Sequence, residues 1–344
     1  VLIESGAAAK IAETIVEKIG ESRALIALAI ATMVLTMVGV FVDVSVITVS
    51  PIALAIAHKS GLSKPAILLA MVGGGKAGNI MSPNPNTIAA ADNLGVSLTN
   101  VMIAGIVPAI FGVIITCILA SRIKQKGSLV ESDEHMKELT DMPGFLPAMV
   151  GPLVAIILLM LRPISGIAID PLIALPVGGI CGILAMGKIK HINKYATYGL
   201  AKMSGVAILL IGTGTLAGII ANSGLKDVII SGINALGLPS FMLAPVSGIL
   251  MSAATASTTS GTAVATSVFG PTIVQLGVAP LATAAMIHAG ATVLDHLPHG
   301  SFFHATGGSV SMDMKERLKL IPYESLVGLT MTIVSTIIFG IILK

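Results

Sequence analysis

The chain has 344 residues, a formal net charge of +3 and an unusually apolar composition. Hydrophobic residues make up 54% of it, charged residues only 11%, and the mean hydropathy is +0.96. Soluble domains carry about 25% charged residues, so the composition excludes a soluble globular protein. Because the apolar runs are continuous rather than alternating, it favours membrane helices over a membrane β-barrel.

One pattern of segments occurs twice along the chain. Residues 3–6 (Ile-Glu-Ser-Gly) and 221–224 (Ala-Asn-Ser-Gly) each open an amphipathic segment, followed by two short apolar segments and a helix interrupted by proline. Paired interrupted segments are typical of secondary transporters. We therefore predict an all-α integral membrane protein of two inverted-topology repeats, each with a re-entrant helical hairpin and a proline-broken transmembrane helix.

The first repeat is predicted to cover residues 1–122. Its hairpin spans 24–58, with arms that are short compared with the ~20 residues that a spanning helix needs. Its broken helix spans 65–93, around the run Met-Ser-Pro-Asn-Pro-Asn. A cytoplasmic linker at 123–144 follows, and it contains the acidic residues Glu131, Asp133, Glu134, Glu138 and Asp141.

The second repeat is predicted to cover residues 145–344. It begins with scaffold helices at 145–222, continues with a hairpin at 240–277, and has its broken helix at 280–305, around a second proline break. No counterpart of the scaffold helices precedes Val1. We therefore expect the N-terminal scaffold helices of the first repeat to be missing from this chain.

The basic residues test this topology. With both hairpins re-entrant, most of the 20 Lys and Arg residues fall on one face of the membrane. Short cytoplasmic loops are rich in Lys and Arg, so this face is the cytoplasmic one. One hairpin then opens inward and the other outward. We expect a multi-pass protein of the inner (cytoplasmic) membrane.

The four interruptions are expected to converge on one polar site. Unpaired backbone groups are tolerated at membrane depth only against protein or a wet cavity. The N-terminal ends of half-helices there favour an anion. The residues predicted to bind substrate are Ser260, Gly261, Thr262, Asn84, Asn86, Thr87, His299 and Ser301. The alternative is that they only cap the half-helices.

Ionisable residues within the apolar segments are the candidates for proton coupling, because burying them in hydrocarbon is costly. Asp43 lies at the first hairpin tip, Lys76 precedes the first break, and Asp295 and His299 lie in the second. Histidine exchanges protons near neutral pH, and burial brings Asp toward that range. Alternatively, Lys76 pairs with Asp43, or Asp295 with a neighbouring histidine, and the pair has only a structural role.

The second break also looks like a cluster of metal ligands. Asp295, His296 and His299 are close in sequence, with His304 further on. They surround a proline break rather than one helix face, and no second cluster completes a coordination set. We therefore predict no metal site and no cofactor, with protons as the coupling ion and sodium as the alternative.

Several motifs resemble the gluconate permease (GntP) family, proton-coupled symporters of the wider ion transporter superfamily. They are residues 3–8, 83–91, 214–224, 260–262 and 294–299. The resemblance implies a transporter, not an enzyme, that takes up gluconate or a related sugar acid, glycerate or hydroxybutyrate by alternating access. It also implies a homodimer in which a scaffold domain holds a moving transport domain. The partners would be a small organic anion and the lipid bilayer, with no nucleic acid.

Two departures from this family leave the substrate open. Gluconate transporters usually carry His-Pro-Gly-Pro at the first break and Glu at the first hairpin tip. Here the break reads Pro83-Asn84-Pro85-Asn86, and the tip residue is Asp43. The alternatives are sodium-coupled transport of citrate or a dicarboxylate, export of an anion such as arsenite, and an intramembrane metal-dependent hydrolase with Asp295, His296 and His299 as ligands.

Overall fold

The computed structural model describes residues 1–130, 142–167 and 169–343. The acidic residues of the predicted linker lie outside the described residues. Within the described ranges every regular element is helical, and the single β-type pairing is an isolated bridge between Ser63 and Leu129. The predicted all-helical class is therefore confirmed.

The first half of the chain contains seven helices. They are α1 (Ala7–Ile19), α2 (Ala24–Met37), α3 (Val42–Ser60), α4 (Lys64–Asn79), α5 (Pro85–Leu94), α6 (Leu98–Ala104) and α7 (Ile106–Arg122). A 3₁₀ turn at Glu21–Arg23 separates α1 from α2. The α2–α3 pair occupies the segment expected for the first hairpin, and α4 and α5 occupy that of the first broken helix.

The second half of the described chain has its helices in a similar order. They are α8 (Phe145–Ser165), α9 (Pro171–Ala185), α10 (Ile192–Ala221), α11 (Leu225–Ala235), α12 (Leu243–Thr255), α13 (Thr258–Val268), α14 (Gly270–Gln275), α15 (Pro280–Gly290), α16 (Ser301–Ser309) and α17 (Met314–Thr336). Short 3₁₀ turns at Ile189–His191 and Ser240–Met242 precede α10 and α12, and a π-helical turn, Ile337–Ile342, ends α17.

Local sequence explains where the first broken helix stops and restarts. The ring of Pro83 has no N–H and disfavours the helical conformation of the residue before it, so the helix cannot run through this point. Asn84 then caps α5, because its side chain accepts hydrogen bonds from the backbone N–H groups of Asn86 and Thr87. Pro85 occupies the first helical position, where a missing N–H costs nothing.

Glycines allow a helix of each hairpin to lie in close contact with the first helix of the broken pair in the same half. All residues of α4 are buried. A Cβ atom at Gly74 would lie 2.0 Å from the carbonyl oxygen of Ala29 on α2, and one at Gly248 on α12 would lie 2.3 Å from the carbonyl oxygen of Ile287 on α15. Small residues allow such backbone contact between membrane helices. The glycine-rich run before the first break therefore serves packing.

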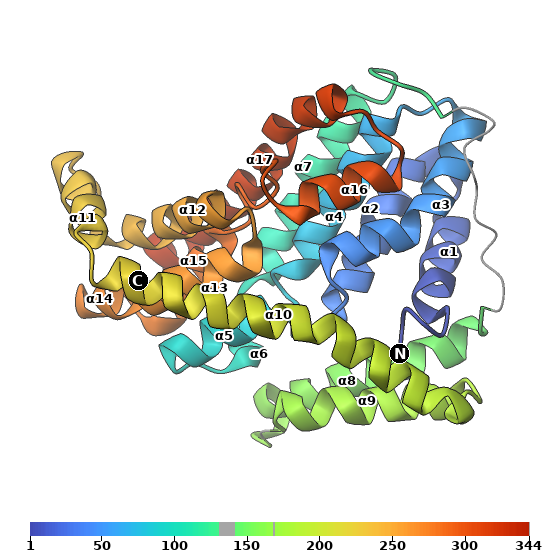
Figure 1. Ribbon diagram of the computed structural model, residues 1–344, viewed down its shortest axis with the longest axis horizontal. Coiled ribbons are helices and arrows are strands. Elements are labelled where there is room, and N and C mark those ends of the chain that lie inside the picture. Colours follow the sequence, from blue (N-terminus) through green and yellow to red (C-terminus); the bar gives the residue numbers. More distant parts are fainter. Residues whose placement is uncertain (131–141, 168, 344) are drawn as a thin grey trace.

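The two halves exchange their short helices. In Figure 1, α5 lies with α12–α15, whereas α16 lies over α3 and α4. The contacts agree, since α5 packs against α13 and α16 packs against α3. Between the two groups, α7 and α17 pack side by side. Each half thus supplies one short helix, together with the break before it, to the other half.

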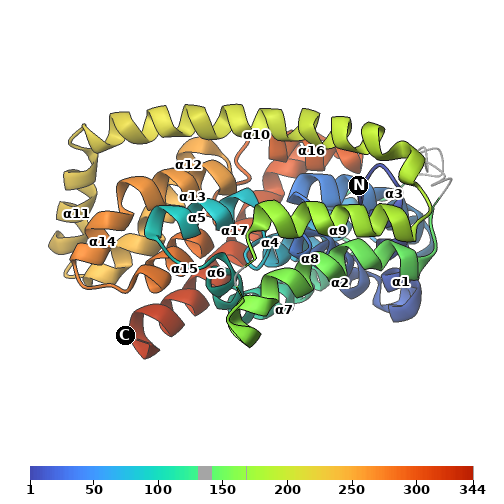
Figure 2. The same ribbon diagram turned by 90° about the horizontal axis from the view of Figure 1, so that it is seen from below.

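The helices α8, α9 and α10 present a largely apolar surface. In Figures 1 and 2, α10 runs along the length of the molecule. Its apolar side chains are strongly exposed, with Leu200 73% and Ile211 74% accessible, and Leu172 on α9 is 83% accessible. Five helices of the described residues are long and apolar enough to cross a membrane, and the pair α1–α2, bent by 99°, would be a sixth. Such exposed surface is expected of a multi-pass protein surrounded by lipid.

We predict that Gly74→Val destabilises the protein by about 1–3 kcal/mol, because the new side chain must force α4 away from α2. Gly205→Val on α10 is the matched control, since no atom lies within 4 Å of a Cβ placed there. Thermal unfolding of the purified protein in detergent measures both effects. Equal unfolding temperatures for the two variants would contradict the close contact between α2 and α4.

Candidate functional site

A cavity of about 140 Å³ lies where four helices begin. A single water molecule needs only ~10–15 Å³, so the cavity has room for a small ligand. Its lining comes from the starts of α3, α5, α13 and α16, from the end of α4 and from the break between α15 and α16. The lining residues are Phe41, Val42, Asp43, Asn79, Asn86, Ala256, Ser257, Thr258, Thr259, Asp295, Ser301 and Phe302. The structure thus brings both hairpin tips and both helix breaks to one place.

The four helix N-termini contribute partial positive charge to this cavity. The N–H groups of a first helical turn have no partner within the helix, and the helix dipole adds partial positive charge there. Side chains of Asn84 and Ser257 cap α5 and α13, whereas α3 and α16 have no side-chain cap. The uncapped ends of α3 and α16 are therefore the places where an anion can accept backbone hydrogen bonds.

In the first break, the predicted site residues divide into caps and a cavity residue. The Oδ1 atom of Asn84 accepts from the Thr87 hydroxyl at 3.2 Å, and its amide nitrogen donates to Asn79, so Asn84 and Thr87 hold the break together. Asn86 lines the cavity, and its Oδ1 accepts a 2.5 Å hydrogen bond from the Thr259 hydroxyl. The Nδ2 group of Asn86 is buried and has no partner in the described part of the chain. Of the predicted residues in this break, Asn86 is thus the donor left for a ligand.

At the second hairpin tip, the cavity is lined by Ser257, Thr258 and Thr259, which precede the predicted residues. Ser260 and Thr262 are buried within α13 instead, and their hydroxyls have no partner in the described residues. Gly261 allows close packing, since a Cβ there would lie 2.6 Å from Cα of Ser252 on α12.

The position of this tip has a local cause. The turn between α12 and α13 is tight because Ala256 takes a left-handed conformation, with φ 44°. Ser257 then serves as the N-cap, which places the start of α13 at Thr258. A serine followed by two threonines after an apolar run is an N-cap signal, and it could have located the tip from the sequence.

Lys76 and Asp295 form a buried ion pair that joins α4 to the second break. Their Nζ and Oδ1 atoms lie 2.6 Å apart, with 1% and 7% of the side chains exposed. The Nζ atom also donates to the carbonyl oxygen of Thr292 at 2.8 Å. The other carboxylate oxygen of Asp295 accepts a 2.5 Å hydrogen bond from the Thr258 hydroxyl. Lys76 therefore pairs with Asp295, and the alternative pairing with Asp43 does not occur.

His296, rather than His299, belongs to this cluster. His296 is fully buried, and its Nδ1 atom lies 2.8 Å from Lys76 Nζ and 3.0 Å from Asp295 Oδ1. His299 is exposed and does not line the cavity. Both histidines lie in the same irregular segment, where no helical period indicates which one points inward.

Asp43 is the carboxylate of the cavity lining that has no partner. It lies half-buried in the first turn of α3. Its side chain forms no hydrogen bond or ion pair with the described residues, whereas Asp295 is fully bonded. Since Lys76 neutralises Asp295, Asp43 carries the unbalanced formal charge of the lining. Ser301, from α16, also lines the cavity and is exposed.

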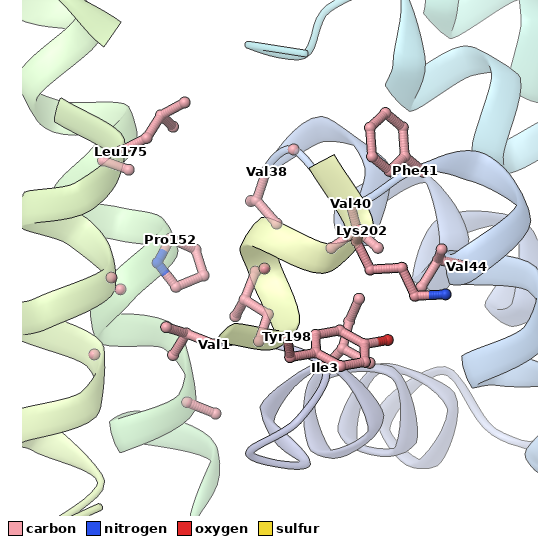
Figure 3. Close-up of a pocket in the computed structure, with 18 of the residues that line it drawn as sticks. Val1, Ile3, Val38, Val40, Phe41, Val44, Pro152, Leu175, Tyr198 and Lys202 are labelled. Carbon is pink, nitrogen blue, oxygen red and sulfur yellow. The ribbon is translucent and has the colours of Figure 1, made fainter. Parts of the chain in front are cut away.

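A larger groove of about 300 Å³ lies beside the cavity. Figure 3 shows Leu175 and Pro152 on one side of it and Phe41 on the other. Apart from Tyr198 and Lys202 of α10, its lining is apolar. Phe41 lines both spaces, so the groove adjoins the polar cavity at the first hairpin tip.

The second break does not have the geometry of a metal site. Both ring nitrogens of His296 lie within hydrogen-bond distance of other groups, Nδ1 beside Lys76 and Nε2 beside the carbonyl oxygen of Ile321 at 3.1 Å. Among the described residues, no three His, Cys, Asp or Glu side chains lie where they could hold a metal ion together.

Comparison with known proteins identifies transporters. An uncharacterized transporter of Haemophilus influenzae is 68% identical over 342 residues, which are 99% of this chain and 82% of that protein. A gluconate permease of Bacillus licheniformis is 23% identical over 341 residues, covering 88% of this chain and 75% of that protein.

A solved structure shares the fold. The crystal structure of the Alcanivorax borkumensis YdaH transporter superposes with a TM-score of 0.66 and 17% identity, covering 99% of this chain and 85% of that one. The family model of the GntP family permeases matches residues 1–342. These names describe transport rather than catalysis. The chain belongs to the GntP family of permeases.

Proposed function

We propose that this chain is a proton-coupled symporter of a small hydroxycarboxylate, such as gluconate or a related sugar acid, and works by alternating access. The observation that carries the proposal is the cavity at which four helix N-termini meet an unpaired carboxylate, Asp43. The helix N-termini of the cavity suit the carboxylate of such a substrate, and its polar side chains suit the hydroxyls. The two halves of the chain, which exchange α5 and α16, match a transporter built from two repeats.

The cavity suits a hydroxylated anion in particular. The substrate carboxylate would lie at the uncapped N-termini of α3 and α16, where backbone N–H groups are free. The substrate hydroxyls would face the Asn86 amide and the hydroxyls of Ser257 and Thr259, which line the same space. The gluconate permease relative supports gluconate as the first compound to test.

Asp43 supports coupling to protons. An anionic substrate that enters beside an ionised Asp43 meets a like charge, which disfavours binding. A proton on Asp43 removes this repulsion, so anion and proton bind together and are released together. The Lys76–Asp295 pair has no net charge, so it does not change the charge that the substrate meets in the cavity. This is the physical basis for symport.

The membrane arrangement is part of the proposal. The hairpins α2–α3 and α12–α13 would enter from opposite faces, as in inverted repeats, with most basic loops on the cytoplasmic side of the inner membrane. The exposed apolar surface of α8–α10 supports contact with lipid or with a second copy in a homodimer.

We predict that Asp43→Asn abolishes accumulation but not exchange. Asparagine resembles the protonated carboxyl but cannot release a proton, so uptake of labelled gluconate driven by a pH gradient should fall by at least about tenfold. Exchange of gluconate across proteoliposomes without a gradient should persist. Both are measured on protein reconstituted in liposomes.

Asp92→Asn is the matched control, because Asp92 is an exposed carboxylate on α5 outside the cavity lining. It should accumulate gluconate like the wild type. Full pH-driven accumulation by Asp43→Asn would overturn the coupling role of Asp43. Accumulation by the wild type that requires a sodium gradient and ignores pH would replace protons with sodium.

We also predict that Lys76→Met destabilises the fold by about 3–5 kcal/mol, because it leaves the Asp295 carboxylate buried without a counter-ion. The double variant Lys76→Met, Asp295→Asn should regain most of this loss, since it contains no buried unpaired charge. Thermal unfolding in detergent compares the variants. A double variant no more stable than Lys76→Met would contradict the pairing.

A further inference from the structure

A second buried ion pair lies on α17, outside the cavity. Arg317 and Glu324 are 1% and 0% exposed, and both guanidinium Nη atoms donate to the carboxylate. Arg317 also donates to the carbonyl oxygen of Phe303 at 3.2 Å and to the Thr306 hydroxyl at 3.2 Å, both on α16. The pair is thus held rigidly between α16 and α17. Binding of the substrate, as proposed above, does not require it.

His296 lies between this pair and the pair at the cavity. Its Nδ1 atom is 2.8 Å from Lys76 Nζ, and its Nε2 atom is 4.0 Å from Glu324 Oε2. The hydroxyl of Ser325 lies 3.3 Å from the same Nε2 atom. The charged groups packed around the ring are therefore Asp295, Lys76 and Glu324, with Arg317 behind Glu324. They form two neutral pairs with one imidazole between them.

The nearest partners of His296 favour one tautomer. Nδ1 lies 2.8 Å from Lys76 Nζ, which can only donate, and 3.0 Å from Asp295 Oδ1, which can only accept. We assign Nδ1 as an acceptor without a proton, because the ammonium group is the nearer of the two and a second N–H would face it. The neutral ring then has its proton on Nε2, which donates to the carbonyl oxygen of Ile321 at 3.1 Å. The ring thus accepts a proton on its cavity side and carries one on the side of Glu324. This is the arrangement that a proton relay needs.

We propose that His296 relays the coupling proton between the substrate cavity and Glu324. The inference rests on the proton-coupled transport proposed above and adds the route by which the proton leaves the cavity. The route begins at Asp295, which lines the cavity, and passes through Lys76 and His296 to the Arg317–Glu324 pair. Arg317 lies in the first turn of α17, beside the exposed Lys315 and Lys319.

Each transfer conserves protons. A proton from the cavity binds the Asp295 carboxylate, and Lys76, which has lost its counter-ion, gives a proton to Nδ1 of His296. The imidazolium then releases its Nε2 proton to Glu324, whose Oε2 atom must first approach from 4.0 Å to hydrogen-bond distance. Asp295 returns its proton to Lys76 across their 2.6 Å contact. One proton has entered at Asp295 and one has reached Glu324. The transfer leaves the neutral ring with its proton on Nδ1, and the starting tautomer returns when that proton leaves Nδ1 and another binds Nε2.

The test is His296→Gln, measured with labelled gluconate in proteoliposomes. Glutamine can accept a hydrogen bond from Lys76 and donate one to Ile321, but it cannot carry a proton between them. Accumulation driven by a pH gradient should fall by at least about tenfold. Exchange without a gradient should match the wild type, because exchange needs no net proton movement.

His288→Gln is the matched control. His288 is also buried, on α15, but its Nε2 atom has no partner in the described residues, and it is not part of the cluster. This variant should accumulate gluconate like the wild type. Full accumulation by His296→Gln would overturn the relay. If the wild-type protein exchanges gluconate but does not accumulate it under a pH gradient, the proposed proton coupling is wrong. This outcome is independent of the result for His296→Gln.

A second variant covers the case in which His296→Gln does not fold. Glu324→Asp keeps a counter-ion for Arg317 but withdraws the carboxylate by one methylene group from His296. Driven accumulation should slow by about threefold or more, with unchanged exchange. A rate of accumulation equal to that of the wild type would overturn the role of Glu324 as the acceptor.

Discussion

Backbone groups at the end of a helix need polar partners, and inside a membrane protein few are available. This constraint organises the structure. Four helices, α3, α5, α13 and α16, begin in the middle of the molecule, and all four first turns line one cavity. The cavity is thus the space in which otherwise unpaired N–H groups can meet water or an anion. The way the chain is interrupted thus brings helix N-termini to one cavity, and this is the basis of the anion site proposed above.

Because the two halves exchange their short helices, both halves contribute residues to this cavity. Because α5 packs against α13 and α16 packs against α3, each hairpin tip faces a break that comes from the other half of the chain. Glycines at helix contacts, such as Gly74 and Gly248, permit backbone approach that larger residues would prevent. Any shift of one half relative to the other must therefore change the shape of the cavity.

The buried charges follow a simple rule of neutral pairs. Lys76 pairs with Asp295, and Arg317 pairs with Glu324, so four ionised side chains lie in the interior without net charge. Breaking such a pair leaves one charge without compensation, which is far more costly than the pair itself. Asp43 stands apart from this rule, and its unpaired carboxylate faces the cavity. The difference distinguishes an unpaired carboxylate at the cavity from the paired charges that join helices in the interior.

The sequence by itself determined the membrane class, the helix interruptions and the family resemblance, because apolar runs, prolines and motif residues act locally. It also indicated Asp43 and Asn86 as cavity residues. Only the tertiary structure decided that Lys76 pairs with Asp295 and that His296 rather than His299 is buried. These contacts join segments far apart along the chain, or lie in irregular breaks without a helical period. Their partners are therefore set by packing.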